Sequence, residues 1–159
     1  MENIFYGKSR KIFLTVHIVL IALWLTFIFY NSFSDGVRST EQSNRVVELL
    51  QGILRRFDPE AMVDASAVRT TAHFVEFLIL GFLYYTLTFY IRSSRISLFF
   101  HSLSLSLFTA FVDETLQLFS DGRGADVRDI WTDLLGAITA HLIAFAVYYT
   151  YKHFKAASR

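Results

Sequence analysis

Carboxylates and amides recur at helical spacing within residues 113–136. Asp113 and Gln117 fall on one helical face, and Asp129 and Asp133 fall on one face of the segment that follows. Between the two segments lies FSDGRGADVRD, whose glycines and aspartates predict a short turn followed by a helix start. We therefore expect the two polar faces to meet beside this turn.

A further polar face lies in RTTAHFVEFLILG, where Arg69, His73 and Glu76 are spaced at i, i+4 and i+7. A helical rise of about 1.5 Å per residue places this face at the depth of the acidic residues near Asp113. The sequence therefore predicts one polar layer that binds a ligand or has another function. The predicted site consists of Arg69, His73, Glu76, Asp113, Glu114, Gln117, Arg123, Asp129 and Asp133.

The chemistry of this layer depends on how its negative charge is neutralised. Several carboxylates in a medium of low dielectric cannot all be ionised unless protons, arginines, a metal ion or a cationic ligand compensate them. The chain has no cysteine, so any metal would be held by imidazole and oxygen ligands, with His73, Glu76, Asp113 and Glu114 as candidates. Two possibilities therefore stay open for the cofactor: the site has none, or it binds a divalent metal. A purely structural clasp of arginine–carboxylate pairs is a third interpretation.

Composition indicates that this layer lies in a membrane. With 53% hydrophobic residues in 159, the chain is too apolar for an ordinary soluble domain and too short for several domains. It has no basic patch with interleaved aromatic residues, which excludes nucleic acid as an expected partner. Acidic residues within membrane segments indicate function. Four segments reach the length of about 20 apolar residues that a crossing helix needs, namely 12–30, 72–91, 96–119 and 130–149.

The sequence therefore predicts an all-α fold, a four-helix transmembrane bundle in a single domain over residues 1–159. The first span follows basic residues, as a signal peptide does, but its apolar run is too long and no cleavage motif follows. We expect it to be a retained anchor. The lipid bilayer is thus the first predicted partner.

The segment between the first two spans contains an amphipathic helix. Apolar residues from Val46 to Phe57 recur at i, i+3, i+4, i+7, i+8 and i+11. Ser39 and Gln42 match a capping box, and Asp58-Pro59 is expected to end the helix. Because the segment is too short and too charged to span, we expect it to lie on the outer leaflet, to cover the pocket as a lid, or simply to pack on the ends of the spans.

The distribution of Lys and Arg predicts the orientation. Residues 1–11, 92–95 and 152–159 carry eight basic residues and one acid, whereas residues 31–69 and 120–129 carry seven basic residues and nine acids over about twice the length. Both termini are therefore expected in the cytoplasm. The amphipathic helix and the polar layer are then extracytoplasmic.

Three stretches form a specific combination: NSFSDG after the first span, R-x-x-AHF-x-EF at the start of the second, and DE-x-x-Q-x-F-x-x-GR followed by RD-x-x-x-D-x-x-G. Together they cover residues 31–36 and most of 69–140, and they resemble the VanZ-like membrane proteins of bacteria. Asp133 stands where that pattern often has asparagine. The resemblance implies a multi-pass protein of the bacterial cytoplasmic membrane that is linked to low-level resistance to the lipoglycopeptide teicoplanin.

Three functions are consistent with these observations. The first is binding of an envelope lipid, a lipoglycopeptide or another amphiphilic or cationic ligand in the outward-facing pocket. The second is an intramembrane enzyme that uses a metal or an acid/base pair on a lipid-linked substrate. The third is a small proton-coupled transporter, which would need to form a homo-oligomer because the chain has no evident internal repeat.

Overall fold

The computed structural model describes residues 2–91 and 94–157, so that Arg92 and Arg159, two of the basic residues that predict the orientation, lie outside the described residues. Within the described part the chain is entirely helical, apart from its turns and loops. The helices are α1 (Glu2–Ser32), α2 (Gly36–Leu54), α3 (Ala65–Ile91), α4 (Arg95–Gln117) and α5 (Val127–Ala157).

Four of these helices are long and apolar enough to cross a membrane, which confirms the predicted four-span, all-α fold. The apolar stretches are Arg10–Ser32, Ala65–Ile91, Ile96–Gln117 and Val127–Ala156. The third span was predicted to continue to Phe119, but α4 ends at Gln117. There the N–H groups of Leu118 and Phe119 bond to carbonyls three residues back, which tightens the last turn and starts the loop.

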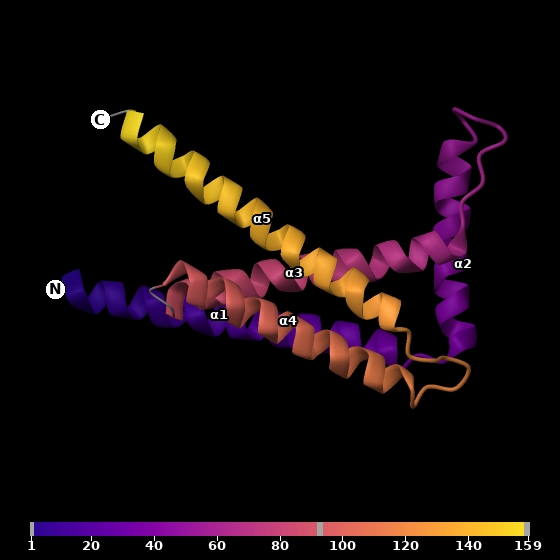
Figure 1. Cartoon of the computed structure of the whole chain (residues 1–159), viewed down its shortest axis with the longest axis horizontal. Coiled ribbons are helices and arrows are strands. Elements are labelled where there is room, and N and C mark those ends of the chain that lie inside the picture. The colour runs from indigo at the N-terminus through magenta and orange to yellow at the C-terminus, as the bar shows by residue number, and fades with distance from the viewer. Residues whose placement is uncertain (1, 92–93, 158–159) are drawn as a thin grey trace.

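The helix α2 lies across one end of the bundle, roughly perpendicular to the spans, and both chain termini lie at the opposite end (Figure 1). We call the first of these the α2 end. There α1 and α4 finish and α3 and α5 begin. Residues far apart in the sequence therefore come together at the α2 end, and the polar segments of the chain meet there.

The most extensive packing joins α3 to α5, because glycines let the two backbones approach closely. A Cβ atom on Gly136 would collide with the backbone oxygen of Phe74, and one on Gly81 would lie 2.9 Å from the Cα atom of Ala137. Real Cβ atoms essentially never come this near. The crossing therefore fixes the residues one turn before Gly136 against the first turns of α3.

The protein core is small, and large apolar side chains cover much of the outer surface of the spans. The buried cluster consists of Ile21, Ile28, Phe77, Leu80, Tyr84 and Ala110. Exposed apolar residues occur on every spanning helix, as at Leu23, Ile79 and Phe108. Such a surface is expected where lipid rather than water surrounds the helices.

The amphipathic helix exists, but its predicted bounds were wrong. The N-cap is Asp35 rather than Ser39, because the Asp35 carboxylate accepts the N–H of Arg38 at 2.8 Å. The helix ends at Leu54, four residues before Asp58, so that Phe57 lies beyond it and is 85% exposed.

The start of α2 is attached to the loop between α4 and α5. Gly36 donates its N–H to the backbone oxygen of Asp121 at 2.8 Å. A Cβ atom on Gly36 would collide with the backbone oxygen of Gly122, and Gly122 has a φ of 72°, in the left-handed region that favours glycine. Both glycines are therefore needed for this close contact, which places α2 over the bundle.

Candidate functional site

A histidine and an aspartate from the two most closely packed helices form the centre of the site. Nδ1 of His73 on α3 lies 3.2 Å from Oδ1 of Asp133 on α5. Asp133 is three residues before Gly136, so the close crossing at that glycine brings its side chain against α3. Both side chains are buried. The sequence predicted both residues, and the structure brings them into contact.

Helix α4 contributes two carboxylates that one amide connects. Nε2 of Gln117 donates hydrogen bonds to Oδ2 of Asp113 at 3.1 Å and to Oε1 of Glu114 at 3.0 Å. Oε1 of Gln117 in turn accepts a hydrogen bond from Arg69 on α3 at 3.2 Å. Gln117 is fully buried. It therefore positions both acids and links them to a cation on another helix.

Helix α1 supplies site residues that the sequence interpretation missed. Ser32 donates its hydroxyl to Oδ1 of Asp113, and Nδ2 of Asn31 donates to Oε1 of Glu76 at 3.2 Å. Nε1 of Trp24 donates to the backbone oxygen of Glu76 at 3.0 Å. The signal available in the sequence was the Asn-Ser pair at the end of an otherwise apolar span.

The loop before α5 closes the site. Nη1 of Arg123 donates to the backbone oxygen of Asn31 at 2.8 Å, and the N–H of Asp126 donates to Oε2 of Glu114 at 2.8 Å. Partial burial and the neighbouring Arg69 lower the pKa of the Arg123 guanidinium from its ordinary value, although nearby carboxylates act in the opposite direction.

The remaining predicted residue, Asp129, lies at the rim of the site. Its Oδ2 atom is 3.8 Å from Nη2 of Arg69. Arg128 lies outside the buried network, because its side chain is 88% exposed and pairs with Asp126 at 2.7 Å. Hydrogen bonds from Arg128 also hold the pKa of the exposed Asp126 carboxyl below its ordinary value. The pair of Arg128 and Asp126 is thus a surface feature.

A cavity of about 160 Å³ lies beside this network, between α1, α2, α3 and the loop before α5. The first half of α2 forms one wall with Ser39, Gln42, Ser43 and Val46. The other lining residues are Asn31, Ser32, Val68, Arg69, Ala72, His73, Glu76 and Arg123.

Only part of α2 covers this cavity. Of the apolar positions expected to close over the pocket, Val46 lines it, whereas Leu49, Ile53 and Phe57 are absent from its lining and exposed. The remaining apolar face of α2 has no buried residue. The wall over the cavity is therefore mainly polar, and the apolar face extends beyond it.

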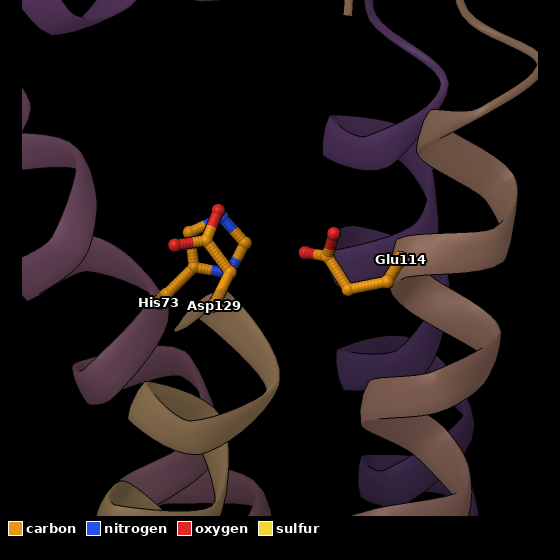
Figure 2. A group of neighbouring side chains, drawn as sticks. All are labelled: His73, Glu114 and Asp129. Atoms are coloured by element: carbon orange, nitrogen blue, oxygen red, sulfur yellow. The ribbon is translucent and has the colours of Figure 1, made fainter. Parts of the chain in front are cut away.

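Two groups of three side chains bring possible metal ligands close together. His73, Asp113 and Asp133 form one group, and His73, Glu114 and Asp129 form the other; within each, one ligand atom per residue lies within 4.8 Å of the others. Figure 2 shows His73 and Asp129 side by side, with Glu114 facing them from α4. Glu76, a predicted ligand, belongs to neither group among the described residues.

The arrangement leaves three buried polar atoms without a hydrogen-bond partner among the described residues. They are Nε of Arg69, Nε of Arg123 and Oδ2 of Asp133. Buried polar atoms in folded proteins are nearly always paired, with protein, water or a ligand. The two arginine atoms belong to residues that line the cavity, whereas the aspartate atom lies in the histidine–carboxylate cluster.

Comparison with known families gives a match over most of the chain. A family model described as VanZ/LLP1 matches residues 17–148, which include every residue of the candidate site. Comparison with curated proteins and with solved structures found no match.

Proposed function

The chain belongs to the VanZ/LLP1 family. We propose that it binds an envelope lipid, through its headgroup, in the cavity at the α2 end. The protein resides in the bacterial cytoplasmic membrane with both termini in the cytoplasm, so the cavity opens toward the outer leaflet. The density of Lys and Arg in the sequence supports this orientation.

The observation that carries this proposal is the charge of the cavity wall. Arg69, Arg123 and His73 line the cavity together with one carboxylate, Glu76. Both arginines have a buried Nε–H without a partner among the described residues. Guanidinium groups bind phosphate through paired hydrogen bonds, so this wall favours a phosphate-bearing headgroup over a ligand that carries only cationic groups.

The surroundings of the cavity suit the rest of a lipid molecule. Val46 and Val68 provide apolar contact beside the charged residues, and the outer surface of the spans is apolar. Glu76 can accept a hydrogen bond from an amine or hydroxyl group of the headgroup. By holding a lipid-linked precursor, or competing with a lipoglycopeptide for it, the protein would change the susceptibility of the cell to teicoplanin, the effect that the family resemblance implies.

Lipid retention by the purified protein tests this function. Arg69→Gln and Arg123→Gln keep most of the side-chain volume and remove the charge, whereas Arg128→Gln removes an exposed arginine that is paired with Asp126. Native mass spectrometry of the three variants should show less retained phosphate-bearing lipid for the first two, and wild-type retention for the third. Equal retention in all four proteins would contradict the proposal.

A further inference from the structure

We infer that His73, Asp113 and Asp133 form a binding site for one divalent metal cation of the Zn²⁺ or Mn²⁺ type, at the point where α3, α4 and α5 meet. This inference does not depend on the nature of the ligand in the adjacent cavity. It rests on the geometry of the three side chains, on their hydrogen bonds and on the lack of an arginine or lysine paired with either aspartate in the described part of the chain.

The geometry comes from three different helices. His73 is on α3, Asp113 on α4 and Asp133 on α5, and their exposed fractions are 7%, 1% and 0%. Their ligand atoms lie within 4.8 Å of one another. Zinc binds imidazole nitrogen and carboxylate oxygen at about 2.0–2.2 Å, so small side-chain rotations would bring all three atoms onto one ion.

The oxygen atom Oδ2 of Asp133 has no hydrogen-bond partner among the described residues, although Asp133 is completely buried. Its other oxygen contacts His73. A bound cation would give this oxygen the partner that it lacks. This unpaired oxygen is an observation separate from the close spacing of the ligand atoms. It indicates that a ligand binds within the cluster.

The negative charge of the cluster is only partly compensated by its neighbours. Among the described residues the ion pairs are Arg69–Asp129, His73–Asp133 and Arg128–Asp126. Neither Asp113 nor Asp133 therefore has an arginine or lysine within 4.0 Å in the described part of the chain. Buried carboxylates are normally paired or coordinate a metal, and one divalent cation would balance two of them.

Hydrogen bonds already orient the ligand from α4. Asp113 accepts the hydroxyl of Ser32 on one oxygen and the amide of Gln117, at 3.1 Å, on the other. Such neutral donors behind a carboxylate are typical of the residues that hold metal ligands in place, and they leave the negative charge available.

The second group, His73 with Glu114 and Asp129, is the poorer site. Both oxygens of Glu114 accept hydrogen bonds, as those of Asp113 do, but Asp129 is 3.8 Å from Arg69. A cation there would have to compete with an arginine. One imidazole and two carboxylates suit Zn²⁺ or Mn²⁺ better than Mg²⁺ or Ca²⁺, which prefer ligand sets made only of oxygen.

Metal titration of the purified protein tests the inference. Full-length protein in lipid nanodiscs is stripped with a chelator, and ZnCl₂ and MnCl₂ are then added separately in a calorimeter. We expect one ion per chain for at least one of the two metals. His73→Gln and Asp133→Asn should each weaken binding at least tenfold, since loss of a residue that merely orients a ligand already costs about 10–100-fold.

The matched control is His141→Gln. His141 is also a buried histidine on a spanning helix, but it is hydrogen-bonded to Ser102 and to the backbone oxygen of Ala137. This variant should bind the metal as the wild type does. Because Asp133 is completely buried, circular dichroism and gel filtration are used to check the folding of each variant, and the wild-type titration is decisive on its own.

Two results would overturn the inference. The first is a chelator-stripped wild type that binds neither metal at millimolar concentration. The second is a loss of affinity in Asp129→Asn with none in a folded Asp133→Asn, since this would place the ion in the other group. Lipid retention is measured on the same samples. It tests the lipid-binding proposal separately, whichever result the metal titration gives.

Discussion

Gln117 of α4 accepts a hydrogen bond from Arg69 of α3 at 3.2 Å, and its amide nitrogen donates to two carboxylates of its own helix. One neutral, fully buried side chain thus connects the cationic and acidic parts of the site. A side-chain amide has one carbonyl acceptor and two N–H donors, so it can accept from an arginine and donate to two carboxylates at the same time. The residue is therefore expected to be important for stability as well as for function.

Replacement of this amide tests its structural role. Gln117→Leu keeps a similar volume but leaves the buried oxygens of Asp113 and Glu114 with fewer donors. We expect the free energy of unfolding to fall by about 1–3 kcal/mol, the cost of leaving a buried polar group unpaired. Unfolding in mixed micelles measures it. The control is Thr115→Ala, whose hydroxyl bonds only to the backbone of its own helix and which should change stability by less than about 0.5 kcal/mol.

The crossing of α3 and α5 is expected to tolerate no side chain at Gly136. The Cβ atom of Gly136→Ala would collide with the backbone oxygen of Phe74, so the two helices would have to separate. We expect a lower unfolding temperature in detergent. Gly52→Ala is the matched control, because nothing lies within 4 Å of its Cβ position and alanine favours a helix by about 0.5–1 kcal/mol. Equal unfolding temperatures in the two variants would contradict this packing.

The helices and the polar layer could be predicted because both depend on local periodicity. A run of about 20 apolar residues determines a span, and helical spacing places His73 on the face that meets the acids. Glu76 follows three residues later, which turns it about 60° around the helix axis. Its carboxylate accepts a hydrogen bond from Asn31 of α1, and among the described residues it belongs to neither group of ligand atoms.

The features that were missed depend on contacts between distant segments. Asp35 rather than Ser39 begins α2, and the adjacent Gly36 is hydrogen-bonded to Asp121, 85 positions further along the chain. The hydroxyl of Ser32 reaches Asp113 in the same way. No pattern within either segment specifies such a partner, because the contact exists only after the four spans have packed.

The orientation can be tested with single cysteines, since the native chain has none. Asn44 on α2 and His153 near the end of α5 are both exposed. If the α2 end faces outward, Asn44→Cys should react with a membrane-impermeant maleimide in intact cells, and His153→Cys should react only after lysis. The opposite pattern would place the cavity on the cytoplasmic side.

Photo-crosslinking from the cavity wall tests the proposed lipid binding in the membrane itself. Val46 lines the cavity, so a photoreactive amino acid at this position should capture the bound lipid in intact cells, where mass spectrometry can identify it. We predict a phosphate-bearing lipid adduct whose yield falls several-fold when Arg69→Gln and Arg123→Gln are added and stays unchanged with Arg128→Gln. An adduct that is independent of the two cavity arginines, or the absence of any lipid adduct, would contradict lipid binding at this site.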